Sequence, residues 1–276
     1  MDESALARGD TGPPGIVPSR GTPPDPRGPD PDGPEPSELT SGFRLAWRRS
    51  PWQVPGGLLL ILALLTVNVL ADGPLAGADR RIRAVVRAHA ASGTWRWLRD
   101  GWHAPAQLLV NCGNYQVAVP VLGACALIVA VRHRTARPLL AALAAVVLLL
   151  ATVTPAKILI GRTGPGLSTV GSGGLGVFPS GHAATAAVCL GVAVMLLLPD
   201  LPAGIRRAAV AGVAGLCFLN GVALVWCDYH WFTDVLGGWA LAGLIAIAVM
   251  KISQASPPEP DGPVGTRSRV IPKWSR

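Results

Sequence analysis

The chain has 276 residues, of which 50% are hydrophobic and only 14% charged, and its formal net charge is +8. Soluble domains carry about 25% charged residues, and the apolar residues here fall in long uncharged runs, which argues against a water-soluble globular domain. Nucleic-acid binding is not indicated, because most arginines flank the apolar runs and form no basic stripe with interleaved aromatic residues. Positive loops at a membrane surface explain the charge better.

Residues 1–43 are predicted to form a disordered cytoplasmic tail. Residues 1–40 are rich in Pro, Gly, Ser and Asp and show no apolar periodicity, so they cannot bury enough surface to offset the entropy of ordering. No apolar stretch follows Met1, and a cleavable signal peptide is therefore not expected. The first membrane span is predicted at about 50–71, directly after a cluster of arginines.

The region from about 72 to 103 combines six arginines with three tryptophans, a density that indicates a loop or helix lying on the membrane interface. Five further spans are predicted within 104–131 and at 138–156, 183–199, 208–226 and 231–250. Each uncharged run has roughly 17–22 residues, close to the ~20 that a helix needs to cross the hydrocarbon layer. The predicted fold is therefore all-α, a polytopic membrane bundle of six transmembrane helices over 44–251, followed by a disordered tail over 252–276.

The Gly-rich segment 157–182 and the turn 227–231 are separated by two predicted spans, so both are expected on the same side of the membrane. The basic residues near the other ends of the spans favour a cytoplasmic location for the opposite face; they are Arg132, Arg134, Arg137, Arg206, Arg207 and Lys251. The six arginines of 72–103 favour the reverse orientation. Charge alone therefore leaves the orientation open.

Three polar patches interrupt this apolar pattern, and they run from Lys157 to Pro165, from Phe178 to His182 and from Asp228 to Asp234. Phosphoryl transfer needs a nucleophile, a proton donor for the leaving oxygen, and groups that stabilise charge on the phosphate oxygens. Asp234 follows His230 by four residues, so on a helix the two side chains share a face. The carboxylate can then accept the ring N–H and hold the tautomer that a nucleophilic imidazole requires.

The candidate catalytic residues are His230 as nucleophile, His182 as general acid and Asp234 as orienting carboxylate. The candidate phosphate-binding groups lie on the first two patches; they are Lys157, Arg162 and the backbone N–H groups of Ser180, Gly181 and His182. Each feature alone also has an ordinary interpretation, such as a helix-end ion pair, a snorkelling lysine or a flexible glycine-rich loop. Their convergence on one membrane face, with a charge at the start of a span, favours a functional site.

No metal or other cofactor is expected. The five cysteines are scattered singly and form neither a Cys-x-x-Cys motif nor a Cys/His cluster, so no zinc site or disulfide framework is indicated. Cys227 is close in sequence to the third patch, and we interpret it as a packing residue.

The three patches, in this order, resemble the motifs of the type 2 phosphatidic acid phosphatase family of membrane enzymes. Lys157 and Pro165 match the motif Lys, six residues, Arg-Pro, and the sequence Pro-Ser-Gly-His ending at His182 is intact. His230 and Asp234 match the His and Asp of the third motif. The resemblance implies a phosphohistidine intermediate and a leaving group protonated by the other histidine, without a metal. It also implies an active site on the extracytoplasmic face of the membrane. We expect this protein in the plasma membrane, with both tails cytoplasmic.

Two positions depart from the family pattern, because Gly164 and Leu224 stand where the first and third motifs have arginine. The loss of one such contact typically costs about 2.7–4 kcal/mol of transition-state stabilisation. Our hypothesis is that Arg162 and an arginine from 80–99 replace the missing pair. The leading functional interpretation is hydrolysis of a lipid phosphate or polyprenyl diphosphate in the membrane. A non-hydrolytic lipid-phosphate binding or transport protein and a lipid phosphotransferase remain open, and the sequence identifies neither the lipid nor the oligomeric state.

Overall fold

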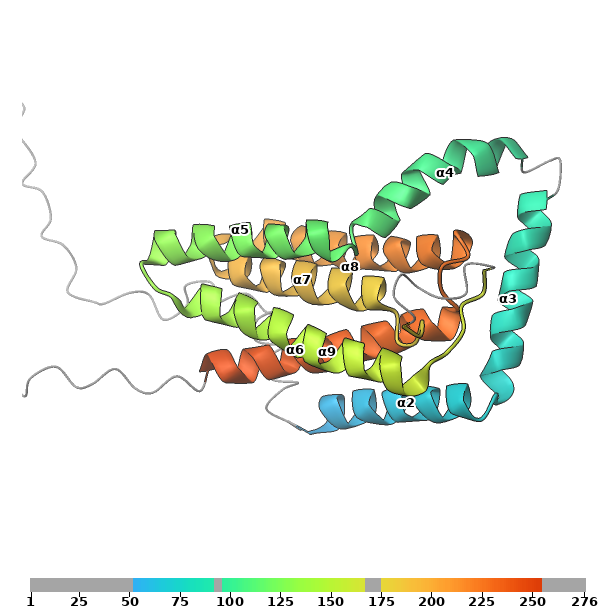
Figure 1. Ribbon diagram of the computed structural model, residues 1–276. Helices are drawn as coiled ribbons and strands as arrows, with labels where there is room; N and C mark the ends of the chain where they lie inside the picture. Colours follow the sequence, from blue (N-terminus) through green and yellow to red (C-terminus); the bar gives the residue numbers. More distant parts are fainter. Residues whose placement is uncertain (1–51, 92–95, 167–174, 255–276) are drawn as a thin grey trace, which may run out of the picture. The chain divides into compact units, whose positions relative to one another are not determined.

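The computed structural model describes residues 52–91, 96–166 and 175–254, and these form a helical membrane domain (Figure 1). Both predicted tails lie outside the described residues, except for 252–254. In the described part of the chain, six helices are long and apolar enough to span a membrane. They are α2 (Gln53–Leu70), α5 (Tyr115–His133), α6 (Arg137–Ile160), α7 (Gly181–Leu197), α8 (Ala203–Trp226) and α9 (Phe232–Gln254). The predicted bundle of six transmembrane helices is confirmed.

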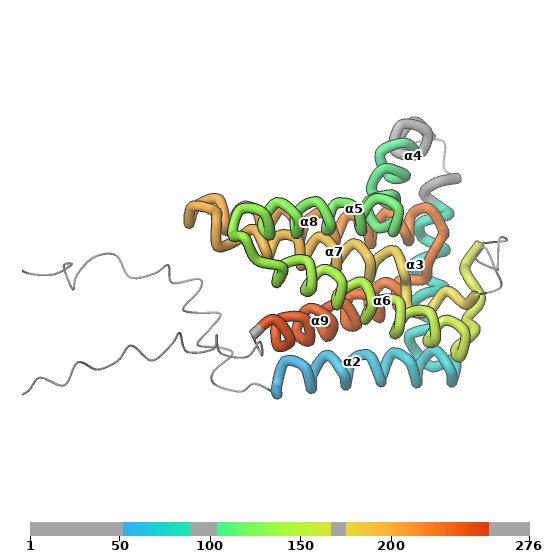
Figure 2. The backbone as a smooth tube through the Cα atoms, turned by 60° about the vertical axis from the view of Figure 1, so that its left-hand side comes forward, coloured from blue at the N-terminus to red at the C-terminus, as the bar shows by residue number. Residues whose placement is uncertain are grey.

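Helix α7 lies at the centre of the bundle and contacts α5, α6, α8 and α9 (Figure 1 and Figure 2). Its buried side chains are mostly small, as the run of Ala183, Ala184, Thr185 and Ala186 illustrates, and small residues let membrane helices approach closely. Half of the α9 span is also buried, compared with 6% of the α2 span. Helices α7 and α9 therefore form the packed centre that positions the functional residues, while α2 lies on the outside against α9.

The region between the first two spans forms two helices, α3 (Pro74–Ala91) and α4 (Arg96–Asn111). The sequence predicted a loop or interfacial helix here. Figure 1 shows α3 running across the ends of the neighbouring spans instead of alongside them. The sharp turn from α2 into α3 uses Asp72 in a left-handed conformation, with φ 46°, and the side-chain oxygen of Asn68 accepts the Leu75 N–H at 3.0 Å.

The turn after α4 packs directly against the start of α7. A β-carbon at Gly113 would lie 2.4 Å from the carbonyl oxygen of His182, so only glycine allows this approach. The side-chain amide of Asn220, on α8, donates to the carbonyl of Leu109 at 2.7 Å and binds the end of α4. The spanning helix begins only after this turn, at Tyr115, so the first residues of the predicted window 104–131 belong to α4.

One helix end differs from the prediction in a way that matters for the site. Helix α6 continues to Ile160 and ends where Gly161 adopts a left-handed φ of 58°. The prediction ended this span at 156 and placed Lys157 at the start of a polar loop. Lys157 lies instead in the last turn of the helix, so its backbone is fixed and its side chain extends from a rigid element.

Candidate active site

The beginning of α9 carries the predicted nucleophile and its carboxylate. Trp231 precedes the first helical residue, and its N–H donates to Asp234 Oδ2 at 2.9 Å, as in a capping box. The same carboxylate oxygen lies 3.4 Å from His230 Nδ1. His230 is 7% exposed and Asp234 fully buried. Because Nδ1 is the ring nitrogen on the carboxylate, Nε2 is the nitrogen left for a reacting group.

The Pro-Ser-Gly-His segment is bound tightly to the same helix. Ser180 caps α7, because its Oγ accepts the Ala183 N–H at 3.2 Å. Its own N–H donates to the backbone carbonyl of Asp234 at 2.9 Å. This contact requires glycine at 238, where a β-carbon would lie 2.7 Å from the Ser180 carbonyl oxygen. The starts of α7 and α9 are therefore joined backbone to backbone.

The two histidine rings consequently lie close together. The ring centroids of His182 and His230 are 6.2 Å apart, and the ring planes are inclined at 59°. The prediction that the two polar segments meet on one side of the bundle is confirmed by this distance. The chemical roles of the two histidines remain predictions.

Lys157 approaches the start of α7 from the last turn of α6. Its Nζ donates to the Gly176 carbonyl at 3.0 Å. A β-carbon at Gly181 would be in ordinary van der Waals contact with this side chain, 4.0 Å from Nζ and 3.4 Å from the preceding side-chain carbon, so the ammonium group lies beside the first residue of α7. A cation beside the N-terminus of a helix, where backbone N–H groups are unpaired, forms a site that attracts anions.

Arg162 lies between two buried carboxylates. Its Nη1 donates to Asp234 Oδ1 and, at 2.7 Å, to the hydroxyl of Thr233, while Nη2 donates to Asp79 Oδ2 at 2.7 Å. The sequence predicted Arg162 and Ser180 as phosphate ligands. The structure shows both with protein partners: Arg162 bridges the two acids, and Ser180 uses its N–H and hydroxyl to join two helices. Both residues therefore hold the site together.

Asp79 belongs to the site but was missed by sequence reasoning. It is only 2% exposed, and its two oxygens accept the backbone N–H of Thr233 at 3.0 Å and its hydroxyl at 2.5 Å. Asp79 was missed because it belongs to the Arg-rich stretch that the sequence assigned to the membrane interface. The available signal was the spacing of Asp79, Arg83 and Arg87, which puts all three on one face of a helix.

Arg83 and Arg87 both bind Asp228, at the turn before His230. The Nε of Arg83 donates to Asp228 at 2.8 Å, and Nη2 of Arg87 donates at 2.9 Å. The hydrogen bond from Arg83 lowers the pKa of Asp228 from its ordinary value of 3.8, and this effect exceeds the opposing effect of partial burial. The same contact raises the pKa of Arg83. An arginine pair from the predicted region 80–99 therefore does reach the polar cluster.

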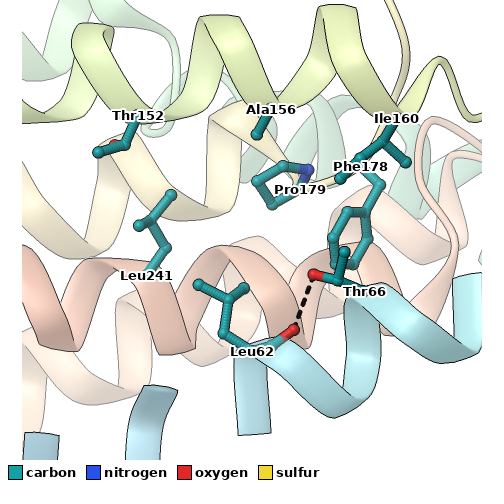
Figure 3. Close-up of a pocket in the computed structure, with 8 residues that line it drawn as sticks. All are labelled: Leu62, Thr66, Thr152, Ala156, Ile160, Phe178, Pro179 and Leu241. Atoms are coloured by element: carbon teal, nitrogen blue, oxygen red, sulfur yellow. Dashed lines mark hydrogen bonds between the residues drawn. The ribbon is translucent and has the colours of Figure 1, made fainter. Parts of the chain in front are cut away.

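An apolar pocket of about 280 Å³ lies beside the polar cluster, between α2, α6 and α9 (Figure 3). Its lining residues are Leu62, Thr66, Thr152, Ala156, Ile160, Phe178, Pro179 and Leu241. The two threonine hydroxyls donate to carbonyls of their own helices, at 2.8 and 2.7 Å, which leaves their methyl groups for the lining. Ala156 and Pro179 directly precede Lys157 and Ser180, so the pocket adjoins the charged site.

Within the described residues, no three His, Cys, Asp or Glu side chains are arranged to hold a metal ion. The five cysteines form no disulfide. Burial raises the pKa of the Cys227 thiol, which favours the unreactive protonated form.

Six membrane spans, with two imidazoles, a carboxylate and a lysine gathered at one end, define a polytopic helical membrane protein with a cluster of polar residues at that end of its bundle. The family model described as the PAP2 superfamily matches residues 138–258, from the start of α6 to just beyond α9. Over these residues the chain is similar to this family, that of the type 2 phosphatidic acid phosphatases, as the three motifs indicated.

A solved structure shares the fold. It is described as the first transmembrane PAP2 type phosphatidylglycerolphosphate phosphatase from Bacillus subtilis, and it matches with a TM-score of 0.62 and 21% sequence identity. The match covers 72% of this chain and 96% of that one. No curated protein matches the chain in sequence.

Proposed function

We propose that the protein is an integral membrane phosphatase that hydrolyses a lipid phosphate or polyprenyl diphosphate through a phosphohistidine intermediate. The observation that carries the proposal is the pair of neighbouring imidazoles, buried His230 on a carboxylate and half-buried His182, both within reach of a single phosphate group. The match of residues 138–258 to the PAP2 family model supports phosphate hydrolysis as the reaction class.

In the first step, the lone pair of His230 Nε2 attacks phosphorus, and the bond from phosphorus to the lipid oxygen breaks. Asp234 accepts the Nδ1 proton in a hydrogen bond and stabilises the positive charge that develops on the ring. His182 protonates the departing lipid oxygen. The products of this step are the lipid alcohol, or the monophosphate when the substrate is a diphosphate, and a phosphorylated His230.

In the second step, His182 takes a proton from water, and the resulting hydroxide attacks phosphorus. The phosphorus–nitrogen bond breaks, its electron pair returns to Nε2 of His230, and inorganic phosphate leaves. His182 therefore acts first as an acid and then as a base, and one turnover restores both histidines to their starting protonation states.

The phosphate oxygens need positive partners, and the described site offers a limited set. Lys157 and the N–H groups at the start of α7 are the partners we assign, including those of Gly181 and His182. Arg83 is a further candidate. Asp228 binds its Nε and Nη2, and its Nη1 has no partner among the residues that the structure describes, so one edge of the guanidinium is available to an anion.

A lipid substrate is supported by the pocket beside the charged cluster. Its wall is apolar, it lies among membrane-spanning helices, and it adjoins both Lys157 and Ser180, so an acyl or prenyl chain could occupy it while the phosphate reaches the histidines. The structural relative is named for a lipid phosphate, phosphatidylglycerolphosphate. Ala156→Phe, which fills part of the pocket, should raise KM more for a long-chain substrate than for a short-chain one.

We further propose that the site opens on the extracytoplasmic face of the plasma membrane, with both tails cytoplasmic. The opposite end of the described bundle carries Arg132, Arg134, Arg206, Arg207 and Lys251, which is the distribution that the positive-inside rule favours for a cytoplasmic face. Labelling of a single cysteine introduced at position 229 or at position 134, with a membrane-impermeant reagent on intact cells, tests the orientation. Labelling from outside only at 134 would contradict it.

The function is tested by phosphate release from a panel of phosphatidate, phosphatidylglycerolphosphate and polyprenyl diphosphate, using the purified protein in lipid nanodiscs. His230→Ala should lower kcat by at least about 10³-fold, since loss of a nucleophile in other enzymes costs up to about 10⁶. His133→Ala, at the far end of the bundle, is the matched control. Acid-labile phosphate on wild-type protein, absent from His230→Ala, would identify the intermediate, whereas equal turnover by the two proteins would refute the mechanism.

A specific observation keeps a binding or transport function as the second candidate. Gly164 and Leu224 replace two motif arginines, and Arg162 is occupied by carboxylates. That function predicts retention of lipid phosphates without phosphate release, and indifference to His230→Ala. A phosphotransferase would form the same phosphohistidine but release phosphate only to an added acceptor alcohol.

A further inference from the structure

Asp79 is a buried carboxylate outside the three polar patches, and it contacts one residue at the start of α9 and one in the segment that follows α6. It accepts the Thr233 N–H and hydroxyl on one side and the Arg162 guanidinium on the other. Thr233 is the second residue of α9, and the first N–H groups of a helix have no partner within the helix. A carboxylate at this position satisfies one of them and interacts favourably with the helix dipole.

The guanidinium of Arg162 binds two carboxylates, and this arrangement determines which oxygen of Asp234 remains for His230. Asp79 binds Nη2, so Asp234 receives Nη1 through one oxygen only, Oδ1. The other oxygen, Oδ2, is left for the Trp231 N–H and for Nδ1 of His230. An unshared guanidinium prefers to bind a carboxylate through two parallel hydrogen bonds, which here would draw Oδ2 away from the histidine.

We infer that Asp79 is a positioning residue of the site: by holding Arg162 and the first turn of α9, it keeps Asp234 Oδ2 on the imidazole of His230. The inference rests on the proposed role of His230 as nucleophile. It assigns to α3 a part in the reaction through contacts that span 154 positions of the sequence.

The main test is Asp79→Asn, which preserves size but removes the charge that competes for Arg162. We expect kcat to fall on the order of 10- to 100-fold, the scale on which outer-sphere partners of a reactive group act, with little change in KM because Asp79 does not contact substrate. The second measurement is histidine-selective ¹⁵N NMR of the protein in nanodiscs, with the His230 signal assigned from His230→Gln. We expect a single Nδ1–H tautomer in wild type and a tautomer mixture in Asp79→Asn.

Asp72→Asn is the control, because Asp72 precedes the same helix but forms an exposed ion pair with Arg80. Its left-handed backbone is one that asparagine accepts well. We expect wild-type kcat and a wild-type spectrum. If Asp79→Asn does not yield a monodisperse protein, Thr233→Val replaces it, because this variant deletes the hydroxyl contact and keeps both charges. A smaller fall in kcat with a changed His230 signal is then expected.

The two measurements separate this inference from the proposed function. A wild-type protein that releases no phosphate would refute the function, while the NMR comparison would still report whether Asp79 fixes the tautomer of His230. Wild-type kcat together with a wild-type His230 signal in Asp79→Asn, or in Thr233→Val if that variant is used, would overturn the inference.

Discussion

Two His–Asp pairs lie at opposite ends of this bundle and differ in almost every respect. His133 Nε2 is 2.9 Å from Asp200 Oδ1 and joins the end of α5 to the short 3₁₀-helix η2 (Leu198–Asp200). His230 Nδ1 is 3.4 Å from Asp234 Oδ2 at the start of α9. Helix α7 connects the two ends, and its 17 residues correspond to about 25 Å.

Distance alone would select the wrong pair as the functional one. The side chain of His133 is 47% exposed, and Arg132 lies 3.8 Å from the same carboxylate, so water and a competing cation weaken the contact. Exposed ion pairs of this kind contribute about 0–1 kcal/mol. Asp234 is fully buried and fixed by Arg162 and the Trp231 N–H. A buried carboxylate with fixed partners can orient an imidazole, and an exposed one only links two helix ends.

The sharpest way to break this comparison is to neutralise each carboxylate in turn. Asp234→Asn should lower kcat on the order of 10⁴-fold, the loss seen when the aspartate of a catalytic triad becomes an amide and the wrong tautomer results. Asp200→Asn should leave kcat within experimental error. Both are measured as phosphate release, with thermal unfolding in nanodiscs to show that each protein is folded. Equal effects of the two substitutions would remove the distinction between the pairs.

The second test substitutes the histidines instead of the aspartates. His182→Ala should lower kcat by roughly 10²–10⁴-fold for a lipid alkoxide leaving group, the usual contribution of a general acid. The loss should shrink for p-nitrophenyl phosphate, whose leaving group needs little protonation. His133→Ala should change neither rate. A loss in His182→Ala that is the same for both substrates would contradict a role as proton donor.

The number of spans and the convergence of the polar patches were predictable from the sequence, and for the same physical reason. Uncharged runs of about 20 residues must cross the membrane as helices, and an even number of crossings between two segments returns them to the same side. This topology places His182 and His230 at the same end of the bundle, and the contact between the starts of α7 and α9 then brings their rings together. The end of α6 was missed because Lys157 was taken as the end of the span, although the apolar residues 158–160 continue the helix.

Asp79 and Asp228 could not have been placed from the sequence, because their contacts depend on how α3 crosses the ends of the spans. The four-residue spacing of Asp79, Arg83 and Arg87 indicates a shared helix face. Nothing in that spacing states which helix the face meets. Arg162 illustrates the same limit. An arginine beside a phosphate-binding motif predicts a contact with phosphate, but in the structure the guanidinium binds Asp79 and Asp234, which only the tertiary fold brings to it.

A third test addresses the close packing of the starts of α7 and α9, which surrounds the buried pair of His230 and Asp234. Gly238→Ala places a β-carbon 2.7 Å from the Ser180 carbonyl oxygen, and such overpacking typically costs about 1–3 kcal/mol. We expect a lower unfolding temperature and reduced activity, because the starts of α7 and α9 must separate. Gly191→Ala is the matched control, since a β-carbon there would meet nothing within 4 Å beyond the backbone of its own helix. Equal stability of the two variants would show that the close approach is dispensable.

The smallest expected effect concerns the ion pair of Arg83 and Asp228, which fastens α3 to the turn before the buried pair. The folded pKa of Asp228 is lowered below its ordinary value of 3.8 by the hydrogen bond from Arg83. The stabilisation is therefore complete above the unfolded pKa and is lost as the pH falls through the folded pKa.

The unfolding temperature of wild type should exceed that of Asp228→Asn by at most about 2–4 °C. This difference should be constant at neutral pH and should shrink below about pH 4. Arg83→Gln should reduce the same pH-dependent difference and leave the part that Arg87 contributes, and the double variant should lose no more than Asp228→Asn alone, because that change already removes the contact with Arg83. A difference that persists to about pH 2, or additive losses, would mean that the charged contact between Arg83 and Asp228 does not attach α3 and that Asp79 and Arg162 hold it at the site.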